Sequence, residues 1–281
     1  MPALQSALLR RAKPLLGTLV EVACQAADAA VTLHANEQAF KAIAAVHQGM
    51  SRHECGSELS ALNRLAPGVW LNVSQAMLDV LLFAQTLSAQ TGGIFDVFTT
   101  CADASPDGSW RDLEMDLPNH RLRKHAPLKA DLGGLGKGYA VDVAVQALQS
   151  AGAHQGWVNA GGDLRVFGSS SLRVQVRAPW NTSQCLDCTT LQNRAAATSA
   201  SYWLETPVLR HGVTRSAVEA TASFTVVAAT CMAADALTKV LAVADGTENP
   251  LQKCSLMALL DRWGAQTWVF RVPAATMSAH A

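Results

Sequence analysis

A glycine-rich segment in the middle of the chain has the composition of an anion-binding loop. It reads Asp131-Leu-Gly-Gly-Leu-Gly-Lys-Gly-Tyr-Ala-Val-Asp142, with four glycines in six positions and a helical pattern directly after them. Glycines leave backbone amides unhindered, and amides at the positive end of a helix bind phosphate groups. Lys137 would add a positive charge, and Asp131 could accept from a ribose, a ring amide or a metal-bound water.

The loop matches neither of the common nucleotide-binding fingerprints. A Walker loop would need Gly where Asp131 stands and Ser or Thr where Gly138 stands, and G-x-G-x-x-G would need a small residue in place of Tyr139. From the residues alone, a phosphate site and a glycine-rich packing turn remain equally open.

A second candidate is a short acidic and hydroxylic stretch, Cys231-Met-Ala-Ala-Asp-Ala-Leu-Thr-Lys239. On a helix, Asp235, Thr238 and Lys239 share one face because they are three and four positions apart. A carboxylate beside a hydroxyl offers oxygen ligands to a hard cation such as Mg²⁺. The competing interpretation is a surface Asp–Lys pair, and spacing alone favours that pair.

A third candidate is the turn in Trp157-Val-Asn-Ala-Gly-Gly-Asp163, where Asn159 and Asp163 flank two glycines. So tight a turn needs backbone with positive φ, which glycine adopts without strain. A binding turn and a purely structural hairpin are both compatible with this pattern.

The elements that would position these groups can be predicted from periodicity and turn signals. Val141, Val145 and Leu148 fall on one face of a helix over residues 139–150, which Gly152 would end. Ser74 would cap a helix over residues 74–90. We also expect helices over 35–50 and 233–243, strands over 17–24, 172–178 and 224–228, irregular structure with short strands over 101–130, and a hairpin of strands 255–260 and 266–272.

These elements predict one α+β domain over residues 1–281, with a core of about 14–272 and flexible termini. Its mixed sheets and flanking helices would surround a central cleft. The chain has 22 basic and 22 acidic residues, so it lacks the basic surplus that is typical of proteins that bind nucleic acid or an acidic membrane surface. No apolar stretch reaches the length of a membrane span. We therefore expect a small-molecule ligand.

The seven cysteines form no regular framework, which is typical of a reducing compartment. Cys185 and Cys188 form a single C-x-x-C without a second pair to complete a zinc site, so we interpret them as incidental thiols in a loop. The first residues lack the apolar run and cleavage site of a signal peptide. The expected location is the cytoplasm.

Taken in order, seven segments resemble motifs of the ApbE family of FAD:protein FMN transferases. The resemblance covers most of the chain. The segments are Leu16-Gly-Thr18, Met50-Ser51 with Ser57-Glu-Leu-Ser-Ala-Leu-Asn63, Gly92-Gly-Ile-Phe-Asp96, Asp131–Asp142, Asn159–Asp163, Ala197-Thr-Ser-Ala200 and Ala234-Asp-Ala-Leu237.

The resemblance implies an enzyme that splits FAD, passes FMN to a Thr or Ser hydroxyl of a target flavoprotein through a phosphoester bond, and releases AMP. It implies Mg²⁺ at the pyrophosphate, bound by a backbone carbonyl at Gly134 together with Asp235 and the hydroxyl of Thr238. Asp235 and His211 would be the catalytic residues. The implied FAD contacts are Leu16, Ile94, Phe95, Asp96, Asp131 and Lys137.

Two departures from the family pattern leave other functions open. The metal helix of the family carries Thr four positions after Asp, where this chain has Lys239. If its ammonium points into the site, it would repel Mg²⁺ and neutralise the pyrophosphate instead; we expect its long stem to carry the charge to solvent. The family segment H-x-x-D-P is reduced to His211-Gly-Val-Thr-Arg-Ser216, in which His211 is either the general base or a loop residue. The alternatives are a non-catalytic FAD-binding or flavin-delivery protein and an FAD pyrophosphatase. The sequence names neither the acceptor protein nor the oligomeric state.

Overall fold

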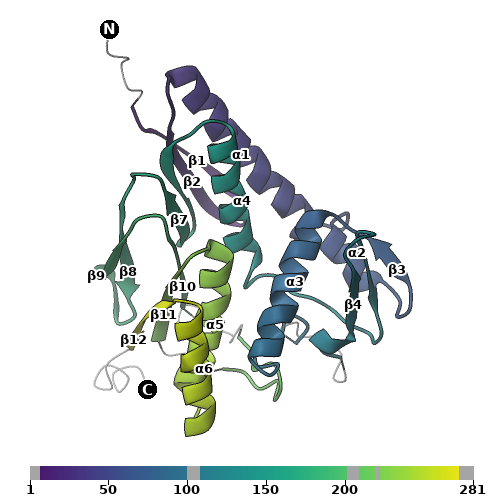
Figure 1. Ribbon diagram of the computed structural model, residues 1–281. Helices are drawn as coiled ribbons and strands as arrows, with labels where there is room; N and C mark the ends of the chain where they lie inside the picture. The colour runs from purple at the N-terminus through teal and green to yellow at the C-terminus, as the bar shows by residue number, and fades with distance from the viewer. Residues whose placement is uncertain (1–6, 100–107, 201–208, 219–221, 272–281) are drawn as a thin grey trace.

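The computed structural model describes residues 7–99, 108–200, 209–218 and 222–271. Within these ranges the chain has the predicted α+β fold, with a seven-stranded sheet, a three-stranded sheet and a two-stranded hairpin (Figure 1). Every described strand pair is antiparallel, so the sheets are antiparallel rather than mixed. The termini that we expected to be flexible, residues 1–6 and 272–281, lie outside the described ranges.

The seven-stranded sheet is the centre of the molecule, and buried core residues lie on both of its faces. Its order is β1 (Leu9–Leu15), β2 (Thr18–Gln25), β6 (Gln155–Ala160), β7 (Asp163–Phe167), β10 (Ala195–Ala200), β11 (Ala222–Ala228) and β12 (Gln266–Arg271). Successive side chains of a strand point to opposite faces. Val22 accordingly joins the main core on the helix side, whereas Ala23 joins a second core on the other side.

Helices cover one face of this sheet, and the hairpin of β8 (Leu172–Ala178) and β9 (Asn181–Leu191) contributes to the core on the other. Helices α1 (Ala29–Met50), α4 (Gly136–Ser150) and α5 (Cys231–Gly246) pack in sequence, and α6 (Pro250–Arg262) packs on α5 (Figure 1). Cys185 and Cys188 lie on β9 rather than in a loop, and both are free thiols. No described helix has both the length and the apolarity of a membrane span.

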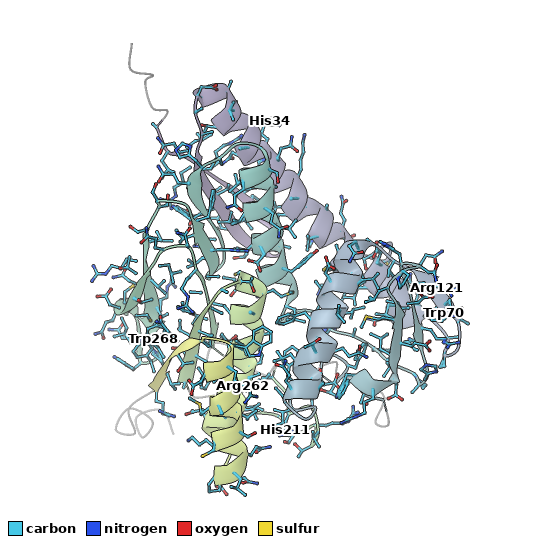
Figure 2. The ribbon with its side chains drawn as sticks, viewed as in Figure 1. His34, Trp70, Arg121, His211, Arg262 and Trp268 are labelled. Atoms are coloured by element: carbon cyan, nitrogen blue, oxygen red, sulfur yellow. The ribbon has the colours of Figure 1, made fainter. Side chains whose placement is uncertain are left out.

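A smaller unit lies beyond these helices in Figure 1 and carries the three-stranded sheet. It comprises α2 (Glu58–Arg64), β3 (Trp70–Asn72), α3 (Gln75–Gln90), the short 3-10 helix η1 (Trp110–Asp112), β4 (Leu113–Asp116) and β5 (Arg121–Lys124). The guanidinium groups of Arg121 and Arg123 lie over the ring of Trp70, 4.4 and 4.5 Å from its centre. Figure 2 shows Trp70 and Arg121 at the edge of the unit. The predicted irregular segment with short strands is confirmed for residues 108–130.

Capping side chains mark the starts of α1 and α3. Ser74 caps α3 as predicted, accepting from the amide of Met77 at 3.2 Å. Helix α1 begins earlier than expected because Asp28 caps it, accepting from Val31 at 2.8 Å.

The predicted hairpin over 255–272 is wrong in its first half, which belongs to α6. Asn249 caps this helix by accepting from Leu251 at 3.1 Å, and Pro250 occupies its first position, where a missing amide costs nothing. The short apolar run at 255–260 fits either period, and the cap decides for a helix. The second strand of the predicted hairpin, β12, does form, but it pairs with β11.

Candidate active site

The glycine loop is fixed in place by Asn63 at the end of α2. The Asn63 side chain donates to the carbonyl oxygen of Ala130 at 3.0 Å and accepts from its amide at 2.7 Å. The next residue, Asp131, accepts from the amide of Gly133 at 2.8 Å and from the guanidinium of Arg52 at 2.7 Å. The loop is therefore held in one conformation on both sides of Asp131.

Helix α4 starts at Gly136, inside the glycine loop, three positions before the predicted start. Its N-cap is Leu135, whose side chain makes no capping hydrogen bond. The positive end of the helix and Lys137 in its first turn therefore face the loop without an N-cap side chain. One amide of this turn, that of Gly138, donates to the Asp235 carboxylate at 3.4 Å.

The starts of α4 and α5 are in direct contact at Gly138. A Cβ on Gly138 would come within 2.5 Å of the carbonyl oxygen of Cys231. One turn later, buried Asp142 accepts from the amides of Cys231 and Met232 at 2.9 Å each and from Arg165 at 2.7 Å. Burial raises the pKa of Asp142, and these donors act against that rise. The two helix starts are thus fixed relative to each other.

Beside the two helix starts lies a cluster of two buried carboxylates and two partly exposed ammonium groups. Lys137 pairs with Asp163 at 2.9 Å, and Lys239 pairs with Asp235. The neighbouring Asp235 carboxylate raises the pKa of Lys137. Burial raises the pKa of Asp235, but Lys239 and Lys137 bring it below its ordinary value. Burial raises the pKa of Asp163 to about 6, and the Asp235 carboxylate adds to the rise.

The residues at the expected metal position do not fit Mg²⁺. We predicted that Lys239 points to solvent, but its ammonium lies on the Asp235 carboxylate and also donates to the Asp235 carbonyl oxygen at 3.0 Å. The hydroxyl of Thr238 donates to the same carbonyl at 2.7 Å and lies 2.7 Å from the Ser199 hydroxyl. Within the described part of the chain, no three His, Cys, Asp or Glu side chains gather as metal ligands.

A cavity of about 330 Å³ opens beside this cluster. The predicted residues Ile94, Phe95, Asp96, Asp131, Gly134 and Lys137 line it, as do Val97, Gly133, Thr198, Ser199, Ala200, Leu209, Arg210, Phe224, Lys239, Val240, Ala242 and Val243. The lining combines apolar and aromatic side chains with the glycine loop and both lysines. Such a combination suits a ligand with a flat ring system and phosphate groups.

Asp96 shapes the cavity wall through its backbone contacts. Its two carboxylate oxygens accept from the amides of Phe98 at 2.9 Å and Trp110 at 3.0 Å, and burial raises its pKa. Beside it, the amide of Gly212 donates to the carbonyl oxygen of Ile94 at 2.8 Å. A Cβ on Gly212 would lie 2.1 Å from the carbonyl oxygen of Gly93, so this contact requires glycine.

The predicted base, His211, is engaged with its own loop. Its Nδ1 accepts from the amides of Val213 and Thr214 at 3.2 Å each, and its Nε2 lies 3.4 Å from the side-chain amide of Gln252. Burial lowers the pKa of His211, which favours the neutral ring. His211 is not among the described residues that line the cavity. It belongs to the segment 209–218, between β10 and β11 in the sequence, and Figure 2 labels it near the lower end of the molecule.

Three other predicted site residues also lie outside the cavity lining in the described structure. Leu16 forms the turn between β1 and β2 with Gly17, at φ of 56° and 70°. Asp235 and Thr238 are 1% and 0% exposed and lie behind Lys239.

Sequence reasoning missed several residues that the structure places at the site. These are Asn63, Asp142, Asp163, Ser199 and Lys239 in their observed roles. The signal was partly present, because Asn63, Asp142 and Asp163 each end a motif quoted above. The role of Lys239 could not be read from spacing, since it depends on the burial of Asp235.

The fold is α+β, and its cavity joins the glycine loop before α4 to an apolar chamber. The chain belongs to the ApbE family, whose profile matches residues 16–105 and 99–253. A search of curated proteins found no match.

Several solved structures share the fold. The apo form of Pseudomonas stutzeri flavinyl transferase ApbE is 20% identical with a TM-score of 0.77, and the alignment covers 98% of this chain and 94% of that one. The flavin transferase ApbE of Vibrio cholerae is 22% identical with a TM-score of 0.76, and the alignment covers 94% of this chain and 93% of that one. The ApbE protein of Thermotoga maritima is 20% identical with a TM-score of 0.77, and the alignment covers 96% of this chain and 99% of that one.

Proposed function

We propose that this chain is an FAD:protein FMN transferase, which attaches FMN through a phosphoester bond to a Thr or Ser of a target flavoprotein and releases AMP. Its family and the flavin transferases that share its fold support this proposal. The observation that carries it is the cavity in which an apolar chamber meets the first turn of α4 and two lysines.

In this proposal the flavin ring lies against the apolar wall, where Phe95, Phe224 and Val243 line the cavity. The pyrophosphate lies at the glycine loop, beside Lys137 and the positive end of α4. Asp131, held by Arg52, accepts from a ribose hydroxyl or a ring amide.

The transfer itself exchanges a phosphoanhydride bond of FAD for a phosphoester bond to the acceptor. The acceptor hydroxyl oxygen forms a bond to the FMN phosphorus, the bond from that phosphorus to the bridging oxygen breaks, and AMP leaves with the bridging oxygen. The hydroxyl proton is released. Lysine ammonium groups and backbone amides neutralise the charge on the equatorial oxygens, and their worth is greatest in a site that excludes water.

The roles predicted for Asp235 and His211 change in this geometry. Asp235 is covered by Lys239, so we propose that it positions the two lysines instead of meeting the ligand. His211 would accept the hydroxyl proton only if its Nδ1 left the amides of Val213 and Thr214. The resemblance implies Mg²⁺ at Asp235, but no step here uses a metal because the residues do not fit one there.

Incubation with FAD and a flavoprotein domain that carries a candidate acceptor Thr tests the function by intact mass. The expected result is an acceptor that gains one FMN while AMP appears in equal amount, and Lys137→Met as a control should slow this gain. Release of AMP and FMN without adduct would instead indicate an FAD pyrophosphatase. FAD binding without turnover would indicate the non-catalytic alternative.

A further inference from the structure

The side chain of Lys239 lies between the Asp235 carboxylate and the glycine loop. Its ammonium contacts the carboxylate and the carbonyl oxygen of Asp235, the latter at 3.0 Å. Its stem lies against Gly134, where an added Cβ would come within 3.0 Å of the Lys239 Cε. The stem is therefore held on both sides, and the side chain is only 18% exposed.

On the side of this cluster a ligand meets the two ammonium groups and not their partner carboxylates. Lys239 and Lys137 both line the cavity, whereas Asp235 and Asp163 do not and are 1% and 3% exposed.

The charges of these four groups also cancel. Each carboxylate is paired with one ammonium group, so the four charges sum to zero. The cluster therefore offers no surplus negative charge to a divalent cation. A cation bound at Asp235 would have to displace the ammonium of Lys239 or lie directly beside it, and like charges at that distance repel strongly.

We propose that the Lys239 ammonium takes the place of a metal ion at the pyrophosphate of the ligand, so that this chain binds FAD without Mg²⁺. The inference rests on the proposed function, since it assigns a role within the same cavity. Lys239 supplies a fixed counter-charge to a phosphate oxygen, and Asp235 holds that ammonium in place from behind. The lysine ammonium is a compact point charge, which suits a single contact to a phosphate oxygen.

Titration of the wild-type protein with FAD in EDTA and in millimolar Mg²⁺ is the first test, with riboflavin as a ligand that lacks phosphate. We expect the FAD dissociation constants in the two conditions to agree within about twofold. A tenfold difference would correspond to about 1.4 kcal/mol of binding free energy. FAD binding that appears only with Mg²⁺ would overturn the inference and leave the proposed function intact. Absence of FAD binding in both conditions would overturn the proposed function as well.

Removal of the charge is the second test, in EDTA throughout. Lys239→Met keeps the length of the stem and should weaken FAD binding at least about tenfold while riboflavin binding stays within about twofold. Lys239→Arg should restore part of the loss. Lys253→Met removes an exposed ammonium on α6 and should change neither affinity.

The double variant Asp235→Asn/Lys239→Met avoids an unpaired buried carboxylate, which can unfold a protein. It should fold and show the same selective loss of FAD. FAD binding as tight as that of the wild type in either Met variant would refute the role of Lys239.

Discussion

Gly138 lies so close to the carbonyl oxygen of Cys231 that a Cβ at that position would come within 2.5 Å of it. The contact joins the starts of α4 and α5, the helices that carry Lys137 and Asp235. Gly136, two positions earlier on the same helix, has no atom within 4 Å of such a Cβ.

These two glycines form a matched pair for mutation. Gly138→Ala should lower the free energy of unfolding by about 1–3 kcal/mol, because backbone cannot yield as a side chain can. Gly136→Ala should be neutral or stabilising by up to about 1 kcal/mol, since Ala is the better helix former. Urea unfolding measures both. Equal effects of the two substitutions would contradict a close contact at Gly138.

The two possible roles of His211 can be separated by Asn and Ala. The side-chain oxygen of Asn can accept backbone amides as Nδ1 does, but Asn cannot act as a base near neutral pH. If His211 holds its loop, His211→Asn should keep most of the transfer rate, and His211→Ala should lose about 1 kcal/mol of stability. Turnover and thermal unfolding report the two effects. A loss of about 100-fold or more in both variants, with normal stability, would restore the general-base role.

Lys239→Thr should create a magnesium site that the wild type lacks. The substitution frees the Asp235 carboxylate and puts a hydroxyl four positions after it on the same helix face. We expect Mg²⁺ affinity to rise at least tenfold, about 1.4 kcal/mol, in calorimetric titration. Lys239→Val has the same shape without the hydroxyl and should gain less. A wild type that already binds Mg²⁺ as tightly as Lys239→Thr would contradict the occupied site.

Asp163 should give stability a specific pH dependence. Its pKa is raised from 3.8 to about 6 by burial, so the folded chain holds a proton on it over that window. The stability that it contributes is fully present below its unfolded pKa and is lost as pH rises through about 6.

Asp163→Asn should remove this dependence. The difference in unfolding free energy between wild type and variant should change by about 1.4 kcal/mol per pH unit within the window. Urea unfolding at several pH values measures it, and Asp261→Asn at an exposed position of α6 is the control. A difference that stays constant between pH 4 and 6 would show that Asp163 has an ordinary pKa.

Local sequence signals predicted the elements that depend on local physics. The alternation in 172–178 gave β8 with the observed bounds, and Ser74 marked the start of α3 because a cap acts within one turn. The helix α6 was missed because its apolar run fits two periods and its cap lies six residues upstream of the run, at Asn249.

The arrangement of the site depends on contacts between distant segments. The glycine loop and five cavity-lining residues named beforehand as FAD contacts do meet in one place. Lys239 turns inward because the fold buries Asp235, and helical spacing does not encode that burial. Ser199 reaches the site only through the pairing of β10 with β7 and β11.

The pairing of β2 with β6 has a consequence for the order of folding. It places Gln25 opposite Gln155, 130 positions apart in the chain, and the whole glycine loop lies within that closed segment. Closing so long a segment costs chain entropy before any contact repays it, which makes such pairings slow to form. The loop, its Asn63 clamp and the start of α4 therefore reach their final positions late, and a refolding chain should regain FAD binding only when its central sheet has closed.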